Sequence, residues 1–275
     1  MRLTTLIENH GNNNQPELLA EHGLSFFIEN QGHFVMSDVG QSGKFADNAD
    51  ILGLDLSDVE ALAISHHHYD HGGGLGRFFM ENRYAKVYLQ DFSAGEPVAV
   101  DSSGEIRQIG LDRRLLSQHE DRLVWVTKSL EPLPGFHLIT EIPDTYPKPS
   151  GDQRLKIRTG EKMNPDTFTH ELVTVLRGED GLVILTGCAH NGLLNMIDAV
   201  RKAFPGQPIQ AVIGGFHLHH EDDEVVKTIG HSLMEEEIPA IYTGHCTGEK
   251  ATNLLEEILG SRLHRLYTGL VMNFD

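Results

Sequence analysis

The stretch Ser65-His66-His67-His68-Tyr69-Asp70-His71-Gly72-Gly73-Gly74 carries the densest group of reactive side chains in the sequence. His66 and His68 are two positions apart, so an extended backbone places both imidazoles on one side. Asp70 and His71 follow at once, and a turn there would aim a carboxylate and an imidazole at a neighbouring point. Two imidazoles for one divalent cation, and a carboxylate with an imidazole for another, are half of a two-cation site. Zinc accepts both kinds of ligand, as do manganese and iron.

The composition favours a metal site before any motif is considered. The chain has 275 residues, with 17 histidines but only two cysteines, and histidine is the commonest protein metal ligand. Its 22 basic and 40 acidic residues give a net charge of −18, which repels phosphate backbones and excludes nucleic acid as a bulk partner. The first residues lack an apolar signal region, and no run approaches the length of a membrane span. We therefore expect a cytoplasmic protein without a membrane partner.

Short apolar runs alternate with helical patterns along most of the chain. The expected strands are residues 3–7, 24–28, 34–39, 61–64, 86–89, 123–126, 136–139, 172–176, 182–185, 211–213, 240–242, 263–267 and 270–274, of which the last two would close the sheet. The expected helices are residues 43–52, 75–80 and 224–234, one helix capped by Asn191 and one started by Thr247. Strands come first and βα alternation follows on both sides of a hairpin. This order predicts an α/β fold with two mixed sheets and helices outside.

The middle of the chain, residues 95–164, is rich in proline and predicts few long elements. We expect one domain over residues 1–275, with a lid-like insertion in this segment. The segment also holds the basic run of an otherwise acidic chain, which consists of Arg154, Lys156, Arg158 and Lys162. This run is either a solvated loop or a group of side chains that meets a phosphorylated substrate.

The spacing His66-x-His68-x-Asp70-His71 resembles the signature of the metallo-β-lactamase superfamily. Ser37-Asp38-Val39-Gly40 is similar to that superfamily's Asp-x-Gly element, whose aspartate supports the histidine loop. Further motifs resemble one branch, the archaeal dihydropterin-(ribofuranosyl)aminobenzene phosphate synthases. These motifs are Glu21-His22-Gly23-Leu24-Ser25-Phe26-Phe27-Ile28-Glu29, Thr186-Gly187-Cys188-Ala189-His190, Gly214-Gly215-Phe216-His217-Leu218 and His245-Cys246-Thr247-Gly248.

The resemblance implies an αβ/βα sandwich with two divalent cations at the sheet edges. Zinc is favoured, and manganese and iron are alternatives. Each later motif should then lie where a strand ends, and Cys188, His190, His217 and His245 do follow apolar runs that predict strands. On this basis one cation takes His66, His68 and His190, and the other takes Asp70, His71 and His245.

Departures from the superfamily pattern leave the bridging ligand open. Many members have a Gly-His pair as a third motif and a bridging aspartate in a Thr-Gly-Asp element. Here no clear Gly-His pair occurs between residues 89 and 185, and Cys188 stands where the aspartate would be. Cys188 is therefore either a ligand or a packed thiol. His217 is either a further ligand or a proton donor, and we expect it to act in catalysis with Asp70. His170 stays open, whereas His22 has no functional role in this interpretation.

Two kinds of chemistry are available to a two-cation centre. It lowers the pKa of water from 15.7 towards about 7, which suits hydrolysis, and it neutralises charge on a phosphate leaving group, which suits transfer. The resembled synthases transfer, joining a dihydropterin-methyl diphosphate to an aromatic amine. We expect a metal-dependent hydrolase or transferase that acts on a phosphorylated or pterin-like small molecule. The alternatives are a generic metallo-hydrolase of a phosphodiester, lactone or thioester, and a metal-binding or redox protein without turnover.

Overall fold

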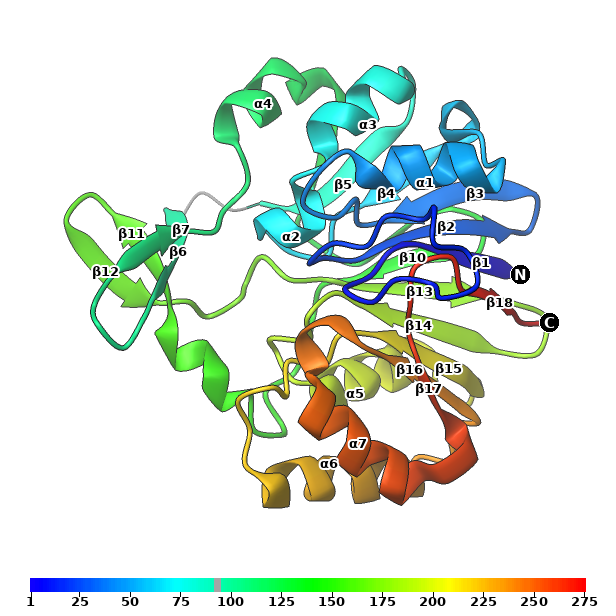
Figure 1. Ribbon diagram of the computed structural model, residues 1–275, viewed down its shortest axis with the longest axis vertical. Coiled ribbons are helices and arrows are strands. Elements are labelled where there is room, and N and C mark those ends of the chain that lie inside the picture. The colour runs from blue at the N-terminus through cyan, green and yellow to red at the C-terminus, as the bar shows by residue number, and fades with distance from the viewer. Residues whose placement is uncertain (92–94) are drawn as a thin grey trace.

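The first of two large β-sheets combines the N-terminal apolar runs with a strand from the other end of the chain (Figure 1). The computed structural model describes residues 1–91 and 95–275. The strand order is β18 (Val271–Asn273), β1 (Arg2–Ile7), β2 (Ser25–Asn30), β3 (His33–Ser37), β4 (Ala61–Ala63), β5 (Lys86–Gln90) and β8 (Leu123–Val126). The strands from β18 to β3 are antiparallel and those from β3 to β8 are parallel. Gln31 and Gly32, both with positive φ, form the tight turn between β2 and β3.

The second large sheet is built from the regular last third of the chain. Its order is β17 (Leu263–Arg265), β16 (Ala240–Thr243), β15 (Ile209–Gly214), β14 (Leu182–Thr186), β13 (Val173–Arg177), β10 (Phe136–Ile139) and β9 (Leu130–Leu133). The predicted hairpin of β13 and β14 is confirmed, and β14 to β17 run parallel. The prediction that the last two strands close one sheet is wrong. β17 pairs with β16, whereas β18 crosses to pair with β1, a long-range choice that no local pattern reveals.

The two sheets face each other and bury one core between them. Each sheet also buries a further core against the helices on its outer face. On β14, Val183 and Leu185 lie in the core between the sheets, and Leu182 and Ile184 pack towards the helices. Both faces of this strand are buried, which explains why it is a continuous apolar run. The predicted αβ/βα sandwich of mixed sheets is confirmed (Figure 1).

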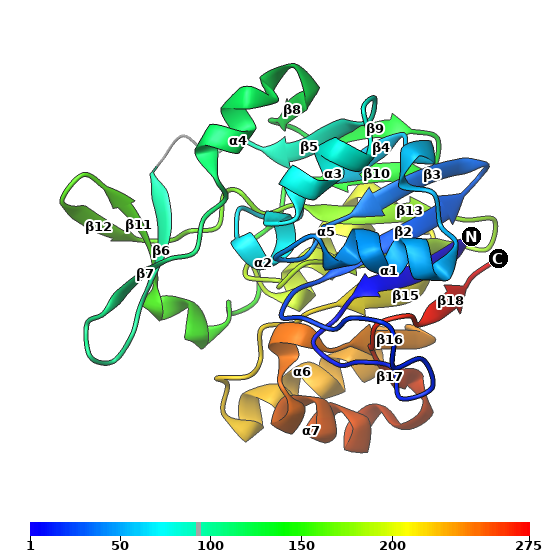
Figure 2. The same ribbon diagram turned by 45° about the horizontal axis from the view of Figure 1, so that its top comes forward.

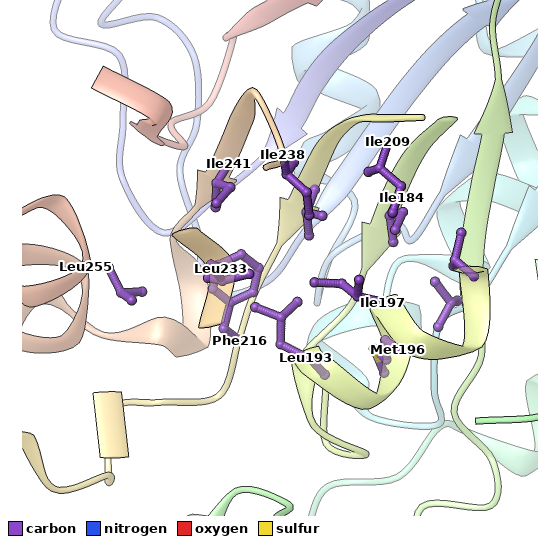
Figure 3. Close-up of a cluster of buried hydrophobic side chains, with 14 of the residues drawn as sticks. Ile184, Leu193, Met196, Ile197, Ile209, Phe216, Leu233, Ile238, Ile241 and Leu255 are labelled. Carbon is purple, nitrogen blue, oxygen red and sulfur yellow. The ribbon is translucent and has the colours of Figure 1, made fainter. Parts of the chain in front are cut away.

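The outer layers hold three principal helices on each side. They are α1 (Lys44–Leu52), α3 (Leu75–Glu81) and α4 (Arg113–Gln118) over the first sheet, and α5 (Leu193–Ala203), α6 (Asp223–Glu235) and α7 (Glu249–Leu259) over the second. Figure 3 shows Ile197 of α5 beside Ile184 of the sheet and Leu193 of the same helix beside Phe216, all within one buried cluster. Short 3₁₀ turns connect other elements, namely η1 (Leu56–Asp58), η2 (Glu120–Arg122) and η5 (Gly260–Arg262).

Two predicted helix starts are wrong, because their side chains make long-range bonds instead. Asn191 does not cap α5; its amide donates to the Phe168 carbonyl and to the Glu171 carboxylate. Thr247 lies in the 3₁₀ turn η4 (His245–Thr247), before α7 begins, and its hydroxyl accepts the Phe216 N–H. Both residues therefore hold neighbouring loops together at one edge of the sandwich.

A smaller antiparallel sheet stands beside the sandwich (Figures 1 and 2). Its order is β12 (Lys162–Pro165), β11 (Leu155–Thr159), β6 (Glu96–Val100) and β7 (Ile106–Gln108). The expected insertion over residues 95–164 is thus not continuous. Its first and last parts form the small sheet, whereas β8, β9 and β10 between them belong to the two large sheets.

The longest helix in residues 1–91 and 95–275 is α6, with 13 residues, and no helix in these ranges could cross a bilayer, which takes about 20 apolar residues. The two ends of the chain lie side by side because β1 pairs with β18 (Figure 2).

Candidate metal centre

The predicted ligands lie in loops that follow strands at one edge of the two sheets. β4 ends before the loop that begins at Ser65, β14 ends before Cys188 and His190, β15 before His217, and β16 before His245. Because β14, β15 and β16 run parallel, their carboxyl ends meet at one edge, which is where ligands bind in such sheets. The strand-end placement predicted from the apolar runs is confirmed.

Glycines shape the histidine loop by allowing two pieces of backbone to touch. After α2 (Tyr69–Gly72), a Cβ on Gly73 would lie 2.4 Å from the Tyr69 carbonyl oxygen and 2.5 Å from that of Gln41. A Cβ on Gly74 would lie 2.2 Å from the carbonyl oxygen of Val39. These glycines therefore let the histidine loop pack closely against the loop after β3.

Three imidazoles form the first group of candidate ligands, His66, His68 and His190, whose donor atoms lie within 4.8 Å of one another. Nε2 of His66 is 3.0 Å from Nδ1 of His68. The ring of His190 stacks on Phe168 with centroids 4.1 Å apart, and its Nδ1 lies 2.7 Å from Oδ1 of Asp152. Asp152 thus fixes the ring so that Nε2 is the nitrogen left for a ligand.

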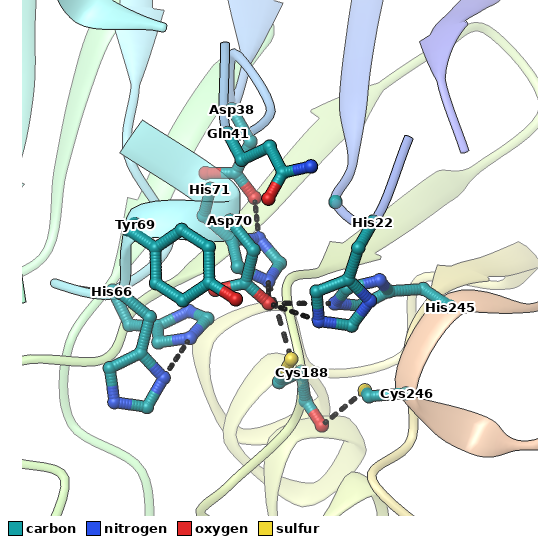
Figure 4. Close-up of polar contacts among 12 residues, drawn as sticks. His22, Asp38, Gln41, His66, Tyr69, Asp70, His71, Cys188, His245 and Cys246 are labelled. Atoms are coloured by element: carbon teal, nitrogen blue, oxygen red, sulfur yellow. Dashed lines mark hydrogen bonds and ion pairs between the residues drawn. The ribbon is translucent and has the colours of Figure 1, made fainter. Parts of the chain in front are cut away.

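The second group combines Asp70, His71, Cys188 and His245 (Figure 4). Oδ2 of Asp70 lies 3.3 Å from Nε2 of His245 and 3.8 Å from Nε2 of His71. Sγ of Cys188 is 3.2 Å from the same His71 nitrogen. Burial alone would raise the pKa of Asp70, but His71, His22 and His245 together hold that pKa well below its usual range. The carboxylate is therefore charged among neutral and cationic neighbours.

The residues present fit divalent cations. Among the described residues, Nε2 of His68 and Nε2 of His190 are buried without a hydrogen-bond partner, and buried polar atoms are normally paired. Burial lowers the pKa of His66 and of His190 well below the usual range and that of His68 to about 3, so these rings are neutral and offer lone pairs. A set of N, O and S donors suits zinc better than magnesium or calcium.

Asp38 supports the histidine loop, as the sequence predicted. Its Oδ2 lies 2.7 Å from Nδ1 of His71, and the carboxylate also accepts the backbone N–H and the hydroxyl of Ser65, each at 2.8 Å. A carboxylate only accepts, so Nδ1 of His71 carries the hydrogen and Nε2 is free for a ligand. Burial disfavours the imidazolium, but the Asp38 and Asp70 carboxylates raise the pKa of His71.

Several residues at the site were missed by sequence analysis. Glu8 and Asn9, directly after β1, contact His245: Glu8 accepts its backbone N–H, and Oδ1 of Asn9 lies 2.9 Å from its Nδ1. His22, which was given no role, lies 3.2 Å from Oδ2 of Asp70 and faces the ring of His245 (Figure 4). The sequence signal that could have identified Glu8 and Asn9 is their position directly after β1, because the other ligand loops also follow strands.

The loop before β13 supplies two further supporting residues. Glu171 accepts the backbone N–H groups of His190, at 2.8 Å, and of Asn191, at 2.7 Å. His170 accepts the backbone N–H of His67 at Nδ1, and its Nε2 lies 3.1 Å from Oδ2 of Asp166. Both of its ring nitrogens are engaged, so His170 holds the histidine loop in place.

His217 lies beside the first group. Its Nε2 is 3.2 Å from Oδ1 of Asp152, its ring centroid is 4.3 Å from that of His190, and it forms a third possible ligand group with His190 and Cys188. Burial, with the Glu171 and Asp166 carboxylates nearby, raises the pKa of Asp152 to about 9. Asp152 thus carries a proton near neutral pH that it can share with His217, a role that the sequence did not predict.

A cavity of about 550 Å³ opens onto both groups, a volume typical of small-molecule sites. Of the predicted basic residues, Arg154 lines this cavity, but Lys156 and Arg158 do not. Arg158 pairs with Glu96 at 2.6 Å instead. Arg107 of β7, which the sequence did not single out, also lines the cavity.

The family profile of the metallo-beta-lactamase superfamily matches residues 19–245, which is most of the chain. The chain belongs to the metallo-beta-lactamase superfamily. Its superfamily relatives include a 7,8-dihydropterin-6-methyl-4-(beta-D-ribofuranosyl)-aminobenzene-5'-phosphate synthase from Methanocaldococcus jannaschii. That relative is 28% identical over 289 residues, which cover 100% of this chain and 97% of the relative. The predicted resemblance to this branch is confirmed.

Solved structures agree with the superfamily assignment. The crystal structure of Tm1679, a metal-dependent hydrolase of the beta-lactamase superfamily, matches with a TM-score of 0.84 and 26% identity, over 100% of this chain and 99% of that one. Zinc-bound PqqB from Methylobacterium extorquens matches with a TM-score of 0.58 and 11% identity over 100% of both chains, which shows the shared fold alone.

Proposed function

We propose that this superfamily member is a metal-dependent enzyme that acts on a phosphorylated, pterin-like small molecule at a two-cation centre. The observation that carries the proposal is the meeting of two ligand groups at one cavity, with Cys188 offering a donor atom to residues of both. The full-length similarity to a synthase whose name contains a dihydropterin and a phosphate supports this substrate class.

In the proposed centre, His66, His68 and His190 hold one divalent cation, and Asp70, His71 and His245 hold the other. Bound cations there would supply Lewis-acid chemistry, which neutralises a phosphate or diphosphate and acidifies water. Cys188 stands between the groups as a further ligand. We favour zinc because the donors include a thiol and several imidazoles, and manganese and iron are the alternatives.

Residues of the chain provide the proton transfer. His217 lines the cavity, its Nε2 lies 3.2 Å from Oδ1 of Asp152 behind it, and Asp152 also contacts His190. In the proposed reaction, His217 donates a proton to the departing group and recovers it through Asp152. Asp70 lies between His71 and His245, and its carboxylate contributes the negative charge of the second ligand group.

Transfer and hydrolysis are both compatible with this centre, and one experiment separates them. The zinc-loaded protein is mixed with a dihydropterin-methyl diphosphate, with and without an aromatic amine, and products are followed by mass spectrometry. A coupled pterin–amine product supports a synthase, as the M. jannaschii relative suggests. Diphosphate release without coupling supports a hydrolase, as the match to Tm1679 suggests. No cation-dependent conversion under either condition would overturn the proposal.

The cation content is tested separately by elemental analysis of the purified protein. We expect two equivalents per chain, falling to about one in Asp70→Asn and in His190→Gln, because each variant removes a ligand from a different group. His231→Gln, an exposed change on α6, is the matched control and should keep both. A wild-type content of one equivalent or none would contradict the two-cation centre.

A further inference from the structure

The small sheet forms one wall of the cavity over the candidate metal centre. Ala99 and Val100 of β6, Arg107 of β7, Leu155 of β11, and Arg154 just before it all line that cavity. Figures 1 and 2 show this sheet standing beyond α2, at the edge where the ligand loops gather. A ligand that fills this cavity would therefore contact the small sheet.

Arg107 is fixed to the ligand loop itself. Its Nη1 donates to the hydroxyl of Tyr69 at 3.1 Å, and its guanidinium carbon lies 5.7 Å from the centre of that ring. Tyr69 stands between His68 and Asp70, one candidate ligand from each group. The guanidinium is thus held at a set position relative to the centre, with further N–H donors left for a ligand.

Arg154 is held by a different contact, with His219. Nδ1 of His219 lies 3.1 Å from the Cys246 carbonyl oxygen, which only accepts, so Nδ1 carries the hydrogen. Nε2 of His219 is therefore an acceptor, and it lies 3.3 Å from Nη2 of Arg154.

In the part of the chain that the structure describes, neither guanidinium forms an ion pair with a carboxylate. Among the ion pairs of residues 1–91 and 95–275, none includes Arg107 or Arg154, whereas Arg158 on the same sheet is paired with Glu96. Besides the candidate ligand Asp70, two carboxylates, Asp101 and Glu105, line the cavity. Asp101 is occupied by its own turn, where it accepts N–H groups of Ser103 and Glu105. Two fixed, unpaired guanidinium groups suit an anion with several acceptor oxygens.

We propose that Arg107 and Arg154 form a recognition site for a phosphomonoester, separate from the group that reacts at the cations. The proposal rests on the proposed function only in assuming that the same substrate reaches the metal centre. It assigns to the small sheet the selection of substrates that carry a terminal phosphate, and it leaves the reaction to the loops of the large sheets.

Calorimetric titration of the purified full-length protein with ribose 5-phosphate, and with ribose as the uncharged match, tests this site. We expect ribose 5-phosphate to bind and ribose not to bind. Arg107→Gln and Arg154→Gln should each weaken binding by about tenfold or more, the usual loss for a charge-assisted phosphate contact. Arg107→Lys should bind with intermediate strength, because it keeps the charge and loses the planar fork.

The matched controls are Lys156→Gln and Arg158→Gln, which change basic side chains of the same sheet that do not line the cavity. Both should bind like the wild type. Equal weakening in these controls, unchanged binding in the double Arg107/Arg154 variant, or equal binding of ribonate in place of the phosphate would each overturn the proposal. Because the readout is binding, it stands whether or not the protein turns over a pterin diphosphate.

Discussion

Glu8 and His245 lie 237 positions apart in the chain, yet the Glu8 carboxylate accepts the backbone N–H of His245 at 2.5 Å. The Glu8 side chain is fully buried, and it also accepts the backbone N–H of His10. His245 has a φ of 49°, a conformation that non-glycine residues adopt only when their surroundings impose it. The end of β1 thus fixes how a candidate ligand on the opposite sheet is presented to Asp70.

Replacement of Glu8 should therefore weaken cation binding without touching a ligand. For Glu8→Gln we expect a loss of about 10- to 100-fold in zinc affinity at the Asp70 group, the range found when partners of metal ligands are changed. Competition with a chromogenic chelator measures this affinity. Glu29→Gln, which changes a half-buried carboxylate of β2 that pairs with Arg2, is the control. Equal affinities in both variants would show that Glu8 only stabilises the fold.

The tautomer of His71 depends on Asp38. In Asp38→Asn the amide oxygen still accepts the Ser65 N–H, but the amide NH₂ faces Nδ1 of His71 and requires a lone pair there. The ring hydrogen then moves to Nε2, the nitrogen that faces Asp70 and Cys188. We expect a 10- to 100-fold loss of zinc affinity and little change in stability, because asparagine tolerates the φ of 60° at this position.

Chelator competition and urea unfolding, measured together, check this prediction. Asp47→Asn, which changes an exposed carboxylate on α1, is the control for the loss of charge. A wild-type affinity in Asp38→Asn would mean that the tautomer of His71 does not control the site.

Cys188 should become a thiolate only when a cation is present. Burial raises the pKa of its thiol, so without a cation the group stays protonated, whereas coordination deprotonates it. Substitution with cobalt(II) should give a near-ultraviolet thiolate-to-metal absorption in the wild type. The band should vanish in Cys188→Ser and persist in Cys246→Ser, because the Cys246 thiol is turned to the Cys188 carbonyl. If the band is absent from both the cobalt-loaded wild type and Cys246→Ser, Cys188 is a packing residue and not a ligand.

Acid should destabilise the cation-free protein. Burial lowers the pKa of His67 from 6.5 to about 3, so between these pH values the unfolded chain binds a proton that the folded chain excludes. Stability is thus fully present above pH 6.5 and is lost as pH falls, by about 1.4 kcal/mol per pH unit for this one group. Urea unfolding of chelator-treated protein at several pH values measures the slope.

The variant His67→Gln should reduce the slope of unfolding free energy against pH by about 1.4 kcal/mol per pH unit, the contribution of one proton. Glutamine can keep the hydrogen bond that Nε2 of His67 makes to the Gln90 carbonyl, at 2.8 Å, without titrating. His231→Gln, exposed on α6, is the control for removal of a histidine. An unchanged slope in His67→Gln would place the acid sensitivity in other buried histidines of the loop.

The ligand loop was predictable because its ligands are close neighbours in the sequence and follow an apolar strand. His190 and His245 were predictable for the second reason, since each comes directly after a short apolar run. Asp152 and His22 could not be found in this way. Each is a single polar residue in an irregular loop, and each is identified only by a contact made across the fold.

The small sheet escaped prediction for a different reason. β6 and β12 contain Pro97 and Pro165, which argue against strands when each is considered locally. β12 is an edge strand, where proline is tolerated, and Pro97 is near the start of β6, before the residues that pair with β7. β7 is exposed along its whole length and has no apolar alternation to detect. The sequence around Arg107 therefore does not distinguish it from other surface arginines, whereas the basic residues of β11 form a recognisable run.

The small sheet also bears on the order in which the molecule is completed. Its β6–β7 hairpin leaves the first large sheet after β5, its β11–β12 hairpin leaves the second after β10, and the two hairpins join where β6 pairs with β11. Their pairing needs segments from both halves of the sandwich, so we expect loop-closure entropy to delay this step. A half-assembled chain would already carry its histidine loop but would lack the proposed phosphomonoester site, so substrate selection would be completed last in folding.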